Sequence, residues 1–436
     1  MATLFKLYVA SMFLLHGLSP LPVMAFGFMV ATLAFLVALA GHQRLVYGLS
    51  FRLDDRWFGA IFLLGLVALL AGPGDIGLQN LIHCALWLSA WVVSFWWVRE
   101  WLLGSGLRFE QVSAAAALGV CMLSLAVLAE FTLVNTTGKY LSDLVYFSID
   151  TFPAATVFDD ALVRPRAFAS EAGFTSIVFE CLTPIALLWM RQARHRLLLL
   201  PLLIVPAYLV LFSAASISCL ALAVIVSGSL TWGTRRTMIV ASGVVTGLAL
   251  LVLLSDVVGF VLYEVILRKY LEFSPDDIAV HEQSFSRPEA YSLAFDLLLA
   301  YPLGIGWGAV SQHLASNIPL LGTPLKGSGL ISFPLEIGAS AGIAGLVAYL
   351  AIVVTKLKRL RRLRSPAGNL VFFALLWVSL HHAVVLEAWF PMLWFCLALA
   401  DAMVVWAAAA PMAATLSVPR QHGAPAGHLT DPCPNT

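Results

Sequence analysis

Charged residues are scarce in this chain: Asp, Glu, Lys and Arg together make up 11% of its 436 residues. Soluble proteins carry about 25% charged and roughly 45 to 50% apolar residues, whereas the apolar share here is 61%. The composition excludes an ordinary soluble protein and indicates one that crosses a membrane many times. Because a spanning helix needs about 20 apolar residues, little chain remains for a separate soluble domain.

Cysteine is also sparse. The six cysteines show neither pairing nor metal-ligand spacing, and we interpret them as small core residues. An inverted internal repeat, which many transporters contain, is not found either.

Apolar runs between polar or Gly/Pro breaks predict an all-α protein with about twelve spanning helices. The predicted spans are 4–17, 21–41, 56–72, 78–98, 112–133, 172–190, 197–212, 216–232, 237–256, 328–353, 369–386 and 389–408.

The distribution of cations predicts the orientation, because Lys and Arg are enriched in cytoplasmic segments. With a cytoplasmic N-terminus, 18 of the 25 cations lie inside, six of them in "KLKRLRRLR", which is interpreted as an anchor at anionic lipid. The outer segments contain the other seven, which are Lys139, Arg164, Arg166, Arg268, Lys269, Arg287 and Lys326.

All seven fall in two long outer loops, at about 134–171 and 257–327, and loops of this length tend to be functional. Residues 1–410 are predicted to form one membrane domain. The Pro/Gly/Ala-rich segment 411–436 is predicted to be a disordered cytoplasmic tail.

The first loop ends in "RPRAFASEAGF". Pro165 favours an extended conformation at Arg164, and residues two apart in an extended segment project to the same side. We therefore expect Arg164 and Arg166 to face one ligand. Glu171 stands where the next helix begins, a position that favours a carboxylate. The alternative is a membrane-surface arginine pair followed by an N-terminal acid.

The second loop contains Arg287, which precedes an amphipathic stretch, and then "PLGIGWG", whose glycines allow a chain reversal and a close approach of backbone to a ligand. After it, Glu336 falls one or two turns inside a predicted span, where an ionisable residue is a functional candidate by default. Its alternative is a structural hydrogen bond to a neighbouring helix.

Other polar residues within the spans are interpreted as structural. His381 and His382 are adjacent and point to different faces, so we expect satisfied bundle histidines rather than a metal site. Glu180 points to the side of the helix opposite Glu171, about 180° around its axis. We therefore expect it to be an acid with a structural role in helix packing.

Three features of residues 112 to 353 together resemble the bacterial O-antigen polymerase and O-antigen ligase family. They are the arginine segment followed by Glu171, the outer-loop arginine before "PLGIGWG", and the Glu336-x-Gly helix start that leads into "GIAGLVAYL". The resemblance implies a GT-C-like membrane fold whose active site faces the periplasm of the bacterial inner membrane. It also implies transfer of a glycan from an undecaprenyl-diphosphate carrier.

Carried over to this chain, the resemblance places Glu171, Arg166 and Arg287 in catalysis, and Arg164, Arg166 and Arg287 at the diphosphate. Glu336, Lys326, Ser328 and His313 are supporting candidates. Ligases carry a histidine about nine residues before the last glutamate, whereas this chain has Gly327 and Ser328 there. The departure favours the polymerase branch.

Arginine remains protonated and holds phosphate through two hydrogen bonds. Since the outer loops also lack an Asp-x-Asp cluster, we predict an inverting transfer without metal or other cofactor. The expected partners are the lipid-linked donor and acceptor, the bilayer, and chain-length and export proteins, but no nucleic acid. Alternatives are an O-antigen ligase, a transporter or flippase of lipid-linked glycan, and a scaffold of an export complex.

Overall fold

The structure, a computed structural model, describes residues 1–14, 26–40, 53–72, 76–141, 156–157, 162–169, 172–232, 287–310, 313, 332–384 and 390–416. Almost all of these residues are helical, as the apolar composition predicts. Within the described ranges the only strands are β1 (Thr156–Val157) and β2 (Leu162–Val163), which pair antiparallel. The prediction of an all-α membrane protein is therefore confirmed at the level of fold class.

Three groups of helices follow one another along the chain. The first group is α1 (Ala2–Ala10) with the 3-10 turn η1 (Ser11–Phe13), α2 (Phe26–Ala40), α4 (Leu53–Ala71), α5 (Leu78–Ser89), the π-helical η2 (Ala90–Trp97), α6 (Val98–Gly104) and α7 (Phe109–Thr137). The second is α9 (Ala172–Arg191), α10 (Arg194–Leu197), η3 (Leu200–Ile204), α11 (Val205–Leu209) and α12 (Ala214–Trp232). The third is α17 (Arg287–Ala300), α19 (Phe333–Arg362), α20 (Pro366–His382) and α21 (Pro391–Leu416).

Five helices among the described residues are long and apolar enough to cross a membrane: Asn80–Gly104, Phe109–Thr137, Ala172–Arg191, Phe333–Arg362 and Pro391–Ala409. Ala2–Phe13, Phe26–Ala40 and Ala214–Leu230 are shorter apolar helices. Every span predicted from the sequence overlaps a helix except 237–256, which lies outside the described residues. The predicted tail is corrected at its start, because α21 continues to Leu416 instead of ending before residue 411.

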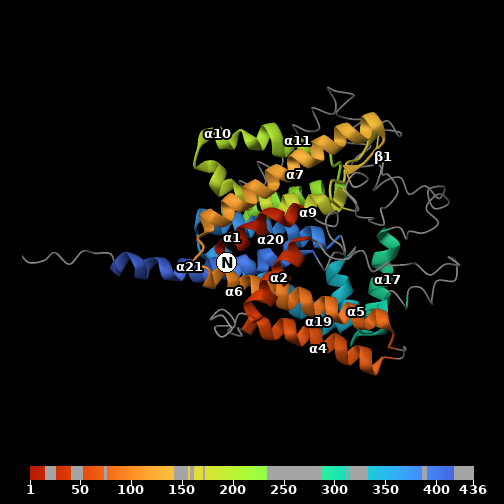
Figure 1. The fold of residues 1–436 in the computed structure, drawn as a ribbon. Helices are drawn as coiled ribbons and strands as arrows, with labels where there is room; N and C mark the ends of the chain where they lie inside the picture. Colours follow the sequence, from red (N-terminus) through yellow and green to blue (C-terminus); the bar gives the residue numbers. More distant parts are fainter. Residues whose placement is uncertain are drawn as a thin grey trace, which may run out of the picture.

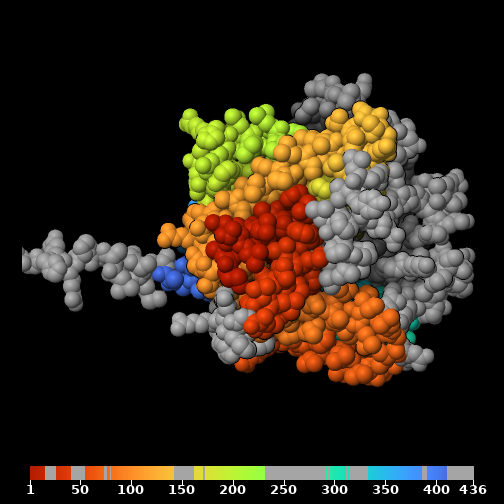
Figure 2. All heavy atoms as spheres, in the orientation of Figure 1, coloured from red at the N-terminus to blue at the C-terminus, as the bar shows by residue number. Residues whose placement is uncertain are grey.

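The helices form one bundle in which α9 packs on both α7 and α20, and α19 packs along α4. Most of the long helices run across the view of Figure 1, so that β1 and α17 lie at one end of the bundle and α10 and the protruding end of α21 at the other. The atoms of α1 and α2 form a continuous patch on the face between α7 and α4 in Figure 2. The end with β1 and α17 is the end that the charge distribution predicts to be outside.

Helix α19 bends sharply at Gly342, whose backbone is not helical (φ 76°, ψ −179°). In a straight helix the 16 residues from Phe333 to Tyr349 would span about 24 Å, yet their ring centroids are 5.3 Å apart. The limb 333–341 therefore folds toward the limb 343–362. The predicted tenth span 328–353 overlaps this helix from Phe333 onward, but the bend at Gly342 was not predicted, and residues 328–331 lie outside the described residues.

The "PLGIGWG" segment packs against this bend. The amides of Ile305 and Gly306 donate to the carbonyls of Ala339 (2.8 Å) and Ser340 (3.0 Å), and the Ile343 amide donates to the Pro302 carbonyl (3.0 Å). The bend frees these groups from helical hydrogen bonds, and the loop satisfies them. The glycines of this loop thus allow its backbone to pack closely against the backbone of α19. The sequence pattern predicts such a close approach to a ligand, whereas here the loop approaches another part of the protein.

Trp307 follows in the same segment and fixes it to the first group of helices. Its indole N–H donates to the Phe62 carbonyl (3.0 Å), and its ring lies 4.6 Å from that of Trp87. Asn80 donates to the Trp307 carbonyl (3.0 Å). The loop is consequently held by α4, α5 and α19 together.

A network of buried charges joins four helices at the other end of the bundle. Arg99 binds Asp55 through two hydrogen bonds of 2.6 and 2.9 Å and also contacts Glu100, while Lys356 lies 2.6 Å from Asp401. Arg99 and Lys356, counted from the sequence as cations of inside segments, are fully buried. Lys356 is therefore a core residue and does not belong to the lipid anchor predicted for its segment.

Candidate functional site

The arginine segment is held at the end of the bundle that contains β1 by Glu130, a buried carboxylate on α7. Glu130 accepts hydrogen bonds from the backbone amides of Leu141 (2.9 Å), Arg166 (2.7 Å) and Ala167. Ala167 has a positive φ of 50°, which is uncommon outside glycine. The carboxylate thus fixes a tight turn directly after Arg166.

Both arginines are nearly buried, each with 6% of its surface exposed, and each contacts a different neighbour. The Arg164 side chain donates to the Leu211 carbonyl (3.0 Å), at the turn between α11 and α12. The Arg166 guanidinium lies over the Tyr140 ring, 3.8 Å from its centroid. Protein therefore covers most of both side chains, so they do not form an exposed pair.

Two further contacts connect the segment to its neighbours along the chain. Asn135, near the end of α7, exchanges hydrogen bonds of 2.8 and 3.0 Å with the backbone of Val163 in β2. Thr175, in the first turn of α9, donates to the Arg166 carbonyl. Glu171 lies outside the described residues, but α9 begins directly after it, as expected from the sequence.

Glu336 lies in the first turn of α19 and is 7% exposed. Its side chain is therefore enclosed by protein. It stands on the limb 333–341, four residues before Ser340, whose carbonyl accepts from the "PLGIGWG" loop. Helices α9 and α19 both pack on α20, so α20 connects the arginine segment with the Glu336 limb.

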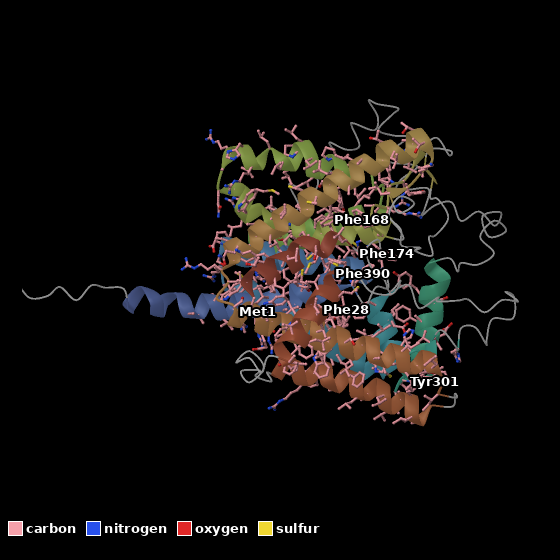
Figure 3. The ribbon with its side chains drawn as sticks, viewed as in Figure 1. Met1, Phe28, Phe168, Phe174, Tyr301 and Phe390 are labelled. Carbon is pink, nitrogen blue, oxygen red and sulfur yellow. The ribbon has the colours of Figure 1, made fainter. Side chains whose placement is uncertain are left out.

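The second outer loop is described only in part. Arg287 begins α17, but its side chain lies outside the described residues, and so do Lys326 and Ser328. His313 is half-buried, and its ring lies 5.8 Å from that of Tyr301. Figure 3 shows Tyr301 apart from Phe168, Phe174 and Phe390, and the rings of Phe174 and Phe390 lie 5.3 Å apart.

Sequence reasoning missed Glu130 and Tyr140, the two residues that fix Arg166. Glu130 is an isolated acid in the long apolar run of α7, and the rule that an intramembrane carboxylate is a functional candidate would have identified it. Tyr140 gave no signal, because one tyrosine in a polar loop is ordinary.

Glu180, His381 and His382 were interpreted as structural residues, and the structure adds a contact that the sequence did not reveal. His381 lies 2.6 Å from Glu180, whereas His382 donates through Nδ1 to the Val378 carbonyl (2.8 Å). The two histidines do face different partners, as expected. Glu180 is more than a packing acid, since its carboxyl group and the His381 ring form a buried polar contact between α9 and α20.

The arrangement combines fixed positive charge, a buried carboxylate and a carboxylate–histidine pair near one end of a membrane bundle. Such groups are suited to binding an anion and moving a proton. No protein-family model matches the chain, and a search of curated proteins finds no relative. The functional assignment therefore depends on the residues themselves.

Proposed function

We propose that the protein is a membrane glycosyltransferase that joins undecaprenyl-diphosphate-linked oligosaccharide repeat units into exopolysaccharide or O-antigen. The proposal includes a GT-C-like topology of twelve spans in the bacterial inner membrane and an active site that faces the periplasm. Its motifs are those that resemble the O-antigen polymerase and ligase family.

The observation that carries the proposal is the fixation of Arg164-Pro165-Arg166. A buried carboxylate binds the backbone at Arg166 and Ala167, and carbonyl and aromatic partners order both guanidiniums before any ligand arrives. Breaking the bond between the anomeric carbon and phosphate leaves a diphosphate whose charge grows in the transition state. Charges fixed in advance stabilise such a state most effectively, since they need no reorganisation.

In this proposal Arg164, Arg166 and Arg287 bind the diphosphate, and Glu171 orients the acceptor hydroxyl on the opposite side of the sugar ring. Glu336, His313, Lys326 and Ser328 belong to the surrounding acceptor region. A single displacement inverts the anomeric centre. The arginines supply the charge stabilisation that a divalent metal gives other transferases, so synthesis is expected to continue in EDTA.

The test uses membranes that contain the wild type or a variant, together with a radiolabelled lipid-linked repeat unit. Arg166→Lys retains the charge but loses the two-pronged geometry. Losing one hydrogen bond to a charged group, about 1.5 to 3 kcal/mol, should slow chain extension on the order of ten- to hundredfold. Lys139→Ala is the control, because Lys139 is an exposed cation of the same loop. Wild-type membranes that make no polymer would contradict the proposal.

The O-antigen ligase remains the nearest alternative, and cells distinguish the two. Deletion of a polymerase leaves single repeat units on the acceptor, whereas deletion of a ligase leaves long chains on the carrier lipid. The absence of histidine near Gly327 and Ser328 favours the polymerase.

A transporter of lipid-linked glycan is the second candidate. Two observations favour it, the bend of α19 and the charges buried between helices. Transporters use both broken helices and intramembrane charges. Against it, the backbone groups at the bend bind the "PLGIGWG" loop, and the charges bind one another. An assay in reconstituted vesicles distinguishes the two functions, because a transporter moves labelled lipid-linked glycan across the bilayer without lengthening it.

A further inference from the structure

A second polar cluster lies inside the bundle, one and a half turns along α9 from the contact of Thr175 with the arginine segment. His381 on α20 lies 2.6 Å from Glu180 on α9. The same carboxylate oxygen also accepts from the Ser216 hydroxyl on α12, and Tyr208 on α11 lies 2.6 Å from Ser216. Glu180, Ser216 and His381 are fully buried.

With Glu180 ionised and His381 neutral, these contacts allow one set of hydrogen-bond directions. An ionised carboxylate only accepts, so Ser216 donates to Glu180 and Tyr208 donates to Ser216. His381 donates through Nδ1–H to the same oxygen, which leaves the lone pair on Nε2. Among the described residues Nε2 has no hydrogen-bond partner, and neither has the second carboxylate oxygen of Glu180.

This is the arrangement of a general base. In carboxylate–histidine dyads the acid holds Nδ1–H, selects the tautomer and stabilises the imidazolium that forms when Nε2 takes a proton. Stability alone gives little reason to retain it, because replacing a buried ion pair by apolar residues of similar volume is often neutral or stabilising. Ionisable residues in a membrane bundle indicate function by default.

The position of the pair fits the proposed reaction. His381 and His382 occupy the last turn of α20, between the helix that follows the arginines and the limb that contains Glu336. His381 faces α9 through Glu180, and the His382 ring lies 6.1 Å from that of Phe333 in the first turn of α19. Tyr291 of α17 donates to the Ala383 carbonyl (3.1 Å), which connects the second outer loop to the same turn.

We propose that His381 is the catalytic base of the transfer and that Glu180 is its positioning residue; this inference rests on the proposed glycosyltransferase function. The acceptor hydroxyl oxygen attacks the anomeric carbon while its proton passes to Nε2 of His381. The bond from that carbon to the phosphate oxygen breaks, and its electron pair leaves with the lipid diphosphate. Glu180 stabilises the imidazolium, which later returns its proton to solvent.

The experiment measures initial rates of chain extension with purified protein in lipid nanodiscs and a lipid-linked repeat unit. In His381→Asn the side-chain amide nitrogen takes the place of Nδ1 and keeps the bond to Glu180, but no basic nitrogen remains. We expect a loss on the order of 10²-fold or more, as for removal of a general base, with unchanged thermal stability. His382→Asn is the matched control and should retain the wild-type rate.

A second variant covers the case in which His381→Asn does not fold. Glu180→Gln keeps an oxygen for Nδ1–H but removes the charge that stabilises the imidazolium, so the rate should fall about tenfold or more. A wild-type rate in either folded variant overturns the inference while leaving the proposed function intact. If the wild type itself extends no chains, the proposed function fails, and this inference fails with it.

The double apolar variant Glu180→Leu/His381→Phe separates catalysis from folding. If the pair only holds α9 to α20, stability and activity should recover together in the double variant. If His381 is the base, the double variant should be stable and inactive. Recovery of activity would overturn the inference.

Discussion

At the scale of single residues, Glu130 explains how a short loop displays two arginines at a defined place. Three amides converge on its carboxylate, two from the arginine segment and one from Leu141. Because Glu130 is buried on a long helix, the bundle itself sets the position of the segment. The arginines depend on a residue more than 30 positions earlier in the chain.

Replacing Glu130 by alanine should release this segment. Three buried amides would lose their partner, at about 1 to 3 kcal/mol each, so the loop should open locally before the bundle unfolds. Limited trypsin digestion should then cut after Arg166, while the bond before Pro165 stays resistant. Glu110→Ala, an exposed acid at the opposite end of α7, is the control. Equal cleavage of the two variants would contradict this role.

The arginine segment was predictable from the sequence, and Glu130 could have been identified as an acid in an apolar run. The contact between the two was not predictable. Two arginines, a proline and a glutamate at a helix start stand out in an apolar chain. Glu130 and the Glu180–His381 pair connect residues far apart in the sequence, and their pairing depends on which helices become neighbours. A single sequence does not contain that information.

At the scale of elements, the bend of α19 sets where Glu336 lies. Both limbs are apolar, so a hydropathy pattern does not distinguish one long helix from two short ones, and the sequence predicted a single span. The bend depends on Gly342, whose conformation is almost restricted to glycine. Most of the other described helices lie close to the predicted spans, because Gly, Pro and polar residues interrupt the apolar runs where the helices end.

Gly342→Ala should therefore be unusually destabilising. A Cβ there would lie 2.5 Å from the Pro302 carbonyl oxygen, in addition to backbone strain of about 1 to 3 kcal/mol. Gly138→Ala is the matched control, since Gly138 also has a positive φ (71°) but an added Cβ meets no atom within 4 Å. Thermal unfolding in detergent should show the larger loss for Gly342→Ala. Equal losses would show that the contact with Pro302 is unimportant.

At the scale of the whole molecule, the buried charges join α4, α6, α19 and α21. They lie far from the arginine segment, at the end predicted to face the cytoplasm. The Phe95 ring of η2 lies 5.4 Å from the Arg99 guanidinium and 4.9 Å from the Lys356 ammonium. We attribute a structural role to this network, because each cation has a carboxylate partner within the protein.

A double-mutant cycle tests that role. Asp401→Leu removes the carboxylate 2.6 Å from Lys356 and should cost about 3 to 5 kcal/mol, since it leaves a buried ammonium poorly compensated. Lys356→Met alone should also destabilise. The double variant should regain most of the loss, because neither charge then remains. Unfolding in mixed micelles with increasing SDS measures the four proteins, and strictly additive losses would contradict the pairing.

The close contact between the tilted rings of Trp307 and Trp87 gives the molecule an internal optical reporter. Two indoles 4.6 Å apart, both buried, couple their electronic transitions, and one of them belongs to the loop that fills the bend of α19. Departure of that loop would uncouple the pair and change the near-ultraviolet circular dichroism and tryptophan emission. A movement of this loop on addition of the proposed substrate would therefore be visible in the unlabelled protein.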